Sequence, residues 1–124
     1  QDAATALGCN VGAIVKSLLF NVGDDFVLCL ISGDKKCSLN KLKKILNKKD
    51  VSMANPDDVK KITGYTIGGV SPIGHLIKVN IFIDINLERF SSVFAAAGHP
   101  NCVFKINFDQ LSKLTLGVVT DLVE

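Results

Sequence analysis

Strand-forming and helix-forming segments follow one another in this chain without an even alternation. Two apolar, β-prone segments at 11–20 and 26–32 flank a turn at 21–25, which predicts a β-hairpin with a loop of about five residues. Two helices, several strands, a helix and a last strand then follow. This order predicts a mixed α/β (α+β) fold, in which helices pack around a mixed sheet.

Caps and periodicities predict the remaining segments. Apolar residues alternate through 79–85, which gives the clearest strand and places Asp84 on its other face. Ser38 is a helix cap, and Asn107 with Gln110 forms a reciprocal capping pair. The expected helices span 3–7, 39–46, 56–63 and 108–114. The further expected strands span 51–54, 78–87, 92–97, 102–106 and 118–122, with a turn or short helix at 87–90.

Composition limits the classes of function. A chain of 124 residues with 48% apolar residues makes one domain, 1–124, and its formal net charge of +2 does not by itself announce a nucleic-acid partner. Seven lysines nevertheless lie between positions 35 and 49 without an acid among them. Such a run is usually a solvated helix face, but Lys41, Lys44 and Lys48 could also contact a phosphate backbone.

The cysteines and the hydropathy point to the cytoplasm. Cys9, Cys29, Cys37 and Cys102 have no C-x-x-C spacing, so we expect reduced thiols and disfavour a disulfide. No apolar run reaches membrane-spanning length, and no leader pattern opens the sequence. We therefore expect a cytoplasmic protein without a membrane partner.

Residues 64–75 contain four glycines, a proline, a serine and a histidine. Gly68 and Gly69 allow a ligand to approach the main chain closely, and Pro72 restricts the backbone around Ser71. A rigid, exposed run of backbone N–H groups would bind carbonyl, carboxylate or phosphate oxygens. A tight structural turn is an equally good interpretation of these residues.

Several side chains are candidates for chemistry, each with an ordinary alternative. Lys16 lies in an apolar strand, either on its solvated face or in a pocket that binds an anion. Asp84 is either a general base or an acceptor for loop backbone N–H groups. Turn histidines His99 and His75 are often merely exposed. Ser71 lacks the second glycine of a nucleophile elbow and is followed by proline.

Taken together, these segments resemble the YbaK / prolyl-tRNA-synthetase-associated editing domain family. The resemblance runs from about residue 3 to residue 122. It rests on Lys16 in its strand, the glycine-rich loop with Pro72, Asp84 in the following strand, and the turn at 97–101. It implies one domain with a mixed, largely antiparallel, barrel-like sheet surrounded by helices.

The resemblance also implies an activity, hydrolysis of the ester in mischarged aminoacyl-tRNA, often tRNA for proline. Lys16 would be the essential lysine near the terminal adenosine, and Gly68 and Gly69 would share the catalytic role by holding the carbonyl. No covalent nucleophile, metal or cofactor is expected, and a synthetase is a further expected partner. The remaining expected substrate-binding residues are Val70, Ser71, Pro72, Gly74, His75, Asp84, Gly98 and His99.

Two other functions remain open. The same pocket could belong to a binding module without turnover, or Cys102 with His99 could act as a thiol hydrolase, a pair whose spacing across a turn gives poor geometry. The chain fits neither specific branch of the family. The alanine-specific branch has an asparagine after the lysine, where this chain has Ser17. The cysteine-specific branch has an arginine and a glycine in the later turn, where this chain has Gly98 and His99.

Overall fold

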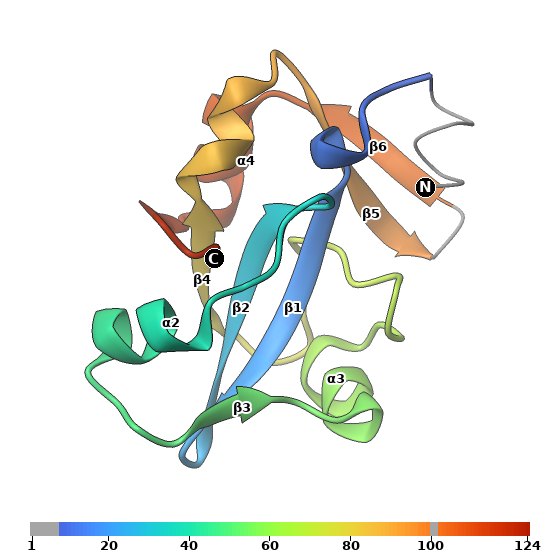
Figure 1. Cartoon of the computed structure of the whole chain (residues 1–124). Coiled ribbons are helices and arrows are strands. Elements are labelled where there is room, and N and C mark those ends of the chain that lie inside the picture. The colour runs from blue at the N-terminus through green and yellow to red at the C-terminus, as the bar shows by residue number, and fades with distance from the viewer. Residues whose placement is uncertain (1–7, 100–101) are drawn as a thin grey trace.

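A five-stranded sheet of order β3-β1-β2-β4-β7 forms the centre of the structure, a computed structural model that describes residues 8–99 and 102–124 (Figure 1). β1 pairs antiparallel with β2 and β3, while β2, β4 and β7 run parallel to one another. A separate antiparallel hairpin is formed by β5 and β6. The strands are β1 (Val15–Val22), β2 (Asp25–Ser32), β3 (Val51–Met53), β4 (Asn80–Asp84), β5 (Val93–His99), β6 (Cys102–Ile106) and β7 (Val118–Thr120).

Local capping explains where the helices begin. Ser38 Oγ accepts a hydrogen bond from Lys41 N, Asn55 Oδ1 accepts from Asp58 N, and Asn107 with Gln110 makes the predicted capping box. These caps confirm the three predicted helix starts. The helices are η1 (Val11–Ala13), α2 (Leu39–Leu46), α3 (Pro56–Thr63), η2 (Ile85–Arg89) and α4 (Phe108–Thr115).

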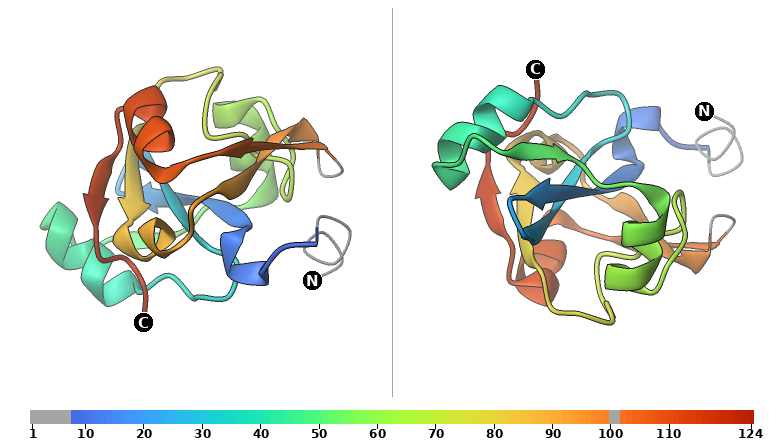
Figure 2. Two further views of the ribbon diagram at one scale, coloured as in Figure 1. Left: turned by 90° about the horizontal axis from the view of Figure 1, so that it is seen from above. Right: turned by 90° about the horizontal axis from the view of Figure 1, so that it is seen from below.

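The two faces of the sheet carry separate cores because side chains alternate along each strand. One core joins Val15 and Leu19 of β1 to α3, α4 and the β5–β6 hairpin. The other joins Phe20 of β1 to Leu42 of α2 and Leu122 near the C-terminus. Figure 2 shows α2 and the C-terminal segment on one side of the sheet and the β5–β6 hairpin on the other.

Several predicted strand boundaries were wrong, with the largest differences at the first hairpin and at the end of β4. The hairpin turn has two residues instead of five, since buried Val22 still pairs with Asp25. The strand predicted from 11 begins only at Val15, after the turn η1. The strand predicted to 87 ends at Asp84, whose carboxylate accepts from Asn86 N at 3.2 Å and starts η2. The helix predicted at 3–7 lies outside the described residues.

The mixed α+β fold itself is confirmed, with three α-helices and largely antiparallel pairing among the described residues. The strands do not close into a barrel. Among the described helices, none is both long enough and apolar enough to cross a membrane.

Candidate active site

The loop at 64–75 is held by its own hydrogen bonds. Gly69 N donates to Thr66 O at 2.9 Å, and the Tyr65 hydroxyl donates to Ile73 O at 2.8 Å. The His75 ring nitrogen Nε2 lies 2.7 Å from Ser71 O. The expectation of an exposed run of free donors holds only in part: residues 66–68, 73 and 74 are exposed, but residues 69–72 are buried and Gly69 N is used within the loop.

The Tyr65 side chain packs between this loop and the end of β5. A Cβ atom on Gly98 would lie 3.0 Å from Tyr65 Cε1, and one on Gly74 would lie 2.7 Å from the Tyr65 hydroxyl. Both glycines have positive φ, +94° and +75°, which side chains rarely adopt. The predicted residues Gly74 and Gly98 therefore make room for Tyr65, which the sequence analysis did not single out.

A pocket of about 380 Å³ lies along the outer edge of β1 and is called here the Lys16 pocket. Its walls include Ile14, residues 15–19 of β1, Gly68 and Val70 of the loop, Val59 of α3 and Ala96 of β5. Consecutive strand residues can line one pocket only where it runs along the strand edge, since their side chains alternate between faces. The pocket thus brings together Lys16 and Gly68, the two strongest sequence candidates.

The edge of β1 that borders this pocket lacks a strand partner along its middle. β3 pairs with Phe20–Val22, and Ile14 forms an isolated bridge to Phe94 of β5. Between them, no described strand pairs with this edge, as the gap between β3 and β5 in Figure 1 indicates. Leu19 O accepts from Ala54 N on this side, so Ser17, two residues earlier, also directs its N–H and C=O outward.

Ser17 and Lys16 lie on opposite faces of β1. Ser17 shares the face of Val15 and Leu19, and its hydroxyl is the one buried side-chain polar atom without a hydrogen-bond partner among the described residues. Lys16 is half-buried, and its ammonium donates to Lys35 O. The pocket is therefore lined by two polar residues, Lys16 and Ser17, whose side chains lie on opposite faces of β1, and its walls are otherwise apolar.

Several predicted residues lie away from the Lys16 pocket. Asp84 is fully buried, and its carboxylate accepts from Leu122 N at 2.8 Å and from Asn86 N, so it holds backbone N–H groups outside the glycine-rich loop. Ser71 Oγ accepts from Ile73 N. Pro72, Gly74 and His75 line a separate groove of about 470 Å³ beside α4.

The turn at the end of β5 is only partly described. His99 is exposed and pairs with Cys102 across the β5–β6 hairpin. Cys102 is also exposed, and neither residue lines the Lys16 pocket. Positions 100 and 101 of the predicted turn lie outside the described residues.

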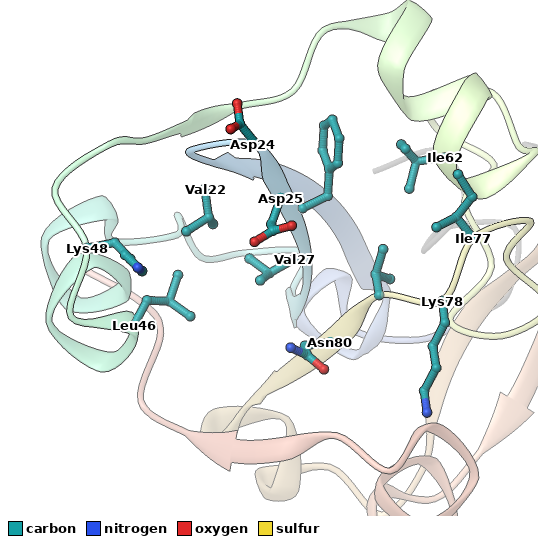
Figure 3. A pocket seen from close by; sticks show the side chains of 12 residues that line it. Val22, Asp24, Asp25, Val27, Leu46, Lys48, Ile62, Ile77, Lys78 and Asn80 are labelled. Carbon is teal, nitrogen blue, oxygen red and sulfur yellow. The ribbon is translucent and has the colours of Figure 1, made fainter.

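A larger pocket of about 630 Å³ lies at the opposite end of the hairpin (Figure 3). Asp24 and Asp25 of the β1–β2 turn line it together with Lys48 and Lys78. It shares no lining residue with the Lys16 pocket and contains none of the predicted catalytic residues. We therefore take the smaller pocket as the candidate active site.

The lysines of α2 differ in their surroundings. Lys41 Nζ donates to Asp121 at 2.7 Å and to Val123 O at 2.6 Å, which ties α2 to the C-terminal segment. Lys44 and Lys48 are exposed. In the described part of the chain, no group of three His, Cys, Asp or Glu side chains is placed to hold a metal ion.

Comparisons with known proteins identify the family. Residues 1–114 match the family described as the aminoacyl-tRNA editing domain. The chain is 32% identical to the uncharacterized protein YwhH of Bacillus subtilis over 96% of this chain and 76% of that protein. It is 28% identical to a candidate Cys-tRNA(Pro)/Cys-tRNA(Cys) deacylase, EbsC, of Enterococcus faecalis, over 98% of this chain and 75% of EbsC.

Longer proteins and solved structures are also similar. A proline–tRNA ligase of Caldicellulosiruptor bescii is 28% identical over 98% of this chain, which spans only 21% of the ligase. A crystal structure of a candidate trans-editing enzyme for prolyl tRNA synthetase superposes with a TM-score of 0.95 at 36% identity, over 99% of this chain and 78% of that chain. The chain therefore belongs to the aminoacyl-tRNA editing domain family.

Proposed function

We propose that this protein is a trans-editing aminoacyl-tRNA deacylase, which hydrolyses the ester of a mischarged tRNA in the Lys16 pocket. The observation that carries the proposal is that one pocket joins Lys16 of β1 to Gly68 of the glycine-rich loop. The names of EbsC and of the crystallised trans-editing candidate support the reaction class.

The reaction needs little from side chains. Water adds to the ester carbonyl, the bond to the ribose oxygen breaks, and the products are a free amino acid and a tRNA with a restored hydroxyl. Backbone N–H groups stabilise the oxyanion that forms, and one such donor is typically worth about a hundredfold or more in rate. We assign this role to the outward-facing N–H of Ser17 and the backbone at Gly68, both of which line the pocket.

The two polar side chains at the strand edge have different tasks. The Lys16 ammonium binds the phosphate or ribose end of the terminal nucleotide, for which it exchanges its contact with Lys35 O. The Ser17 hydroxyl, which has no partner among the described groups, accepts from or donates to the aminoacyl group. Together they hold the ester in place so that water can attack it.

The apolar wall selects the amino acid by size. Val59, Val70 and Ala96 form that wall, which suits a small side chain. One methylene group changes binding by only about 1–3 kcal/mol, which is why a separate editing pocket is useful to a synthetase. From the ligase and deacylase relatives, we infer a tRNA for proline that carries a small non-cognate amino acid, a synthetase as partner, and a cytoplasmic location.

The test is hydrolysis of tRNA for proline charged with alanine, cysteine or serine, using wild type, Lys16→Ala and the control Lys105→Ala. Lys105 is an exposed lysine of β6 that does not line the pocket and lies outside the lysine run at 35–49. We expect one ester to be hydrolysed, the rate to fall about a hundredfold or more in Lys16→Ala, and the control to keep it. Unchanged turnover in Lys16→Ala would remove this assignment.

One observation favours a second function, a binding module without turnover. The residues that line the Lys16 pocket include no histidine, cysteine, aspartate or glutamate that could act as a general acid or base. A module of this kind would bind an aminoacyl-adenosine analogue tightly. It would hydrolyse none of the charged tRNAs in the panel while remaining folded.

A further inference from the structure

Cys29 and Cys37 form a pair of thiols on the α2 face of the sheet. Cys29 lies in the middle of β2, opposite Leu18, and is fully buried. Cys37 follows β2 in the segment that leads to α2, bridges to Val123, and packs against the same core while remaining partly exposed. Both cysteines carry free thiols.

Cys37 packs against the core cluster that contains Cys29, and each thiol shifts the pKa of the other. The pKa of the Cys37 thiol is lowered, chiefly by hydrogen bonding from Cys29 and further by the nearby Lys16 cation. Burial, Asp84 and Glu124 act in the opposite direction. The pKa of Cys29 is raised because hydrogen bonding to Cys37 holds its proton and because it is buried. Cys37 is therefore the more nucleophilic and the more accessible member of the pair.

The segment that carries Cys37 also carries the hydrogen-bond partner of Lys16. Lys16 Nζ donates to Lys35 O, two residues before Cys37. A disulfide brings its two sulfurs to about 2.05 Å, closer than two thiols that are not bonded to each other, so the segment must move toward β2 when the bond forms. That movement shifts Lys35 O and with it the ammonium at the edge of the Lys16 pocket.

We propose that Cys29 and Cys37 form a reversible disulfide that displaces the Lys16 ammonium and slows the pocket's reaction. The effect on deacylation rests on the proposed function, whereas the disulfide itself does not. The oxidant is a hydroperoxide or a small-molecule disulfide, and the reductant is a dithiol.

The chemistry balances with a hydroperoxide as oxidant. The Cys37 thiolate attacks the peroxide and becomes a sulfenic acid, releasing hydroxide or alkoxide, which takes up the proton lost by the thiol. The Cys29 thiol then attacks the sulfenic sulfur, and water leaves as the disulfide forms. The two thiols together lose two electrons. Hydrogen peroxide is reduced to two molecules of water, and an organic hydroperoxide is reduced to one water and one alcohol. A dithiol reverses the change by thiol–disulfide exchange.

The first experiment maps the disulfide in the full chain after hydrogen peroxide treatment, with remaining thiols alkylated in denaturant. Trypsin cleaves after Lys16, Lys35, Lys36 and Lys41, so Cys29 and Cys37 fall in separate peptides, 17–35 and 37–41. We expect these two peptides to be linked, and a dithiol to release them. The control Cys102→Ser should show the same linkage, while Cys37→Ser should not.

The second experiment measures the effect on the pocket in two ways. We expect deacylation to fall about tenfold to a hundredfold on oxidation, because a misplacement of about 1 Å can cost that much, and to recover with dithiol. The extent to which an amine-specific reagent labels Lys16, measured by peptide mapping, should also change on oxidation and return with dithiol. Both responses should be absent from Cys37→Ser.

Each outcome decides a part of the proposal. Peptides 17–35 and 37–41 left unlinked, while Cys9 or Cys102 is oxidised, would overturn the disulfide. A linkage that leaves both the Lys16 labelling and the rate unchanged would overturn the coupling to Lys16. If no charged tRNA is hydrolysed at all, the proposed function fails, but the linkage and the Lys16 labelling still decide the inference about the thiols.

Discussion

Replacing Asp84 with asparagine should destabilise the fold while leaving the chemistry of the Lys16 pocket intact. Asp84 is fully buried, and its two carboxylate oxygens accept from Leu122 N at 2.8 Å and from Asn86 N at 3.2 Å. A hydrogen bond to a charged group contributes about 1.5–3 kcal/mol. Asparagine keeps one acceptor and turns an amide N–H₂ toward the other donor, so we expect a loss of about 1.5–3 kcal/mol in the free energy of unfolding.

The alanine variant sets the upper limit of the effect. Asp84→Ala loses both bonds, about 3–6 kcal/mol, and leaves the Leu122 N–H buried without an acceptor. Total stabilities of domains lie at about 5–15 kcal/mol, so this variant would be close to unfolding. Asp84→Asn is therefore the informative substitution.

The assay is urea unfolding followed by circular dichroism, combined with deacylation measured per folded molecule. Glu124→Gln is the matched control, because it removes an exposed carboxylate from the same C-terminal segment. Exchange of the Leu122 amide hydrogen should accelerate in Asp84→Asn and remain slow in the control. If Asp84→Asn unfolds at the same urea concentration as wild type but no longer deacylates, this reasoning is refuted, because Asp84 would then act on the substrate.

Three further predictions concern the pocket, the core and the acid stability. Ser17→Ala should raise KM for the charged tRNA with little change in unfolding, because its hydroxyl is buried in the Lys16 pocket without a protein partner among the described groups; unchanged kinetics would count against a substrate contact. Leu42→Ala should lower the free energy of unfolding by about 2–5 kcal/mol in urea, since Leu42 is fully buried against the sheet. The hydrogen bond from Lys41 lowers the pKa of Asp121 below its ordinary 3.8, so the stability from this pair is present above 3.8 and is lost as the pH falls through the folded value. Urea titrations between about pH 5 and pH 2 should therefore show a weaker acid dependence in Lys41→Met than in wild type.

Signals confined to a few neighbouring residues predicted much of the secondary structure. Helix α2 has the predicted bounds, and the Asn107–Gln110 capping box forms as expected, because both depend on residues within one or two helical turns. The end of β4 was missed because only part of its signal is local, the capping of η2 by Asp84 through Asn86 N, while the rest is a distant contact. Apolar alternation continues past Asp84 to Ile85, but the Asp84 carboxylate also bonds Leu122, 38 positions later in the chain.

The site was only partly predictable for the same reason. The residue types alone predicted Lys16 and the glycines around Gly68 as candidate site residues, and Lys16 and Gly68 both line the pocket. The open edge of β1 could not be read from the sequence, since it exists because β3 and β5 pair with the two ends of that edge and leave its middle free. A signal for Ser17 was available, however: it is a small polar residue between Val15 and Leu19, on the face that packs into the core.

The adjacency of Lys16 and Ser17 makes the register of the β1–β2 hairpin a determinant of function. Side chains alternate between the faces of a strand, so a shift of one residue would turn the cation toward the apolar core and the hydroxyl toward α2. The same shift would exchange the backbone groups that face the pocket with those that pair with β2. The two-residue turn at Gly23 and Asp24 fixes this register by pairing Val22 with Asp25. A turn far from the pocket thereby decides which polar groups an aminoacyl ester would meet there.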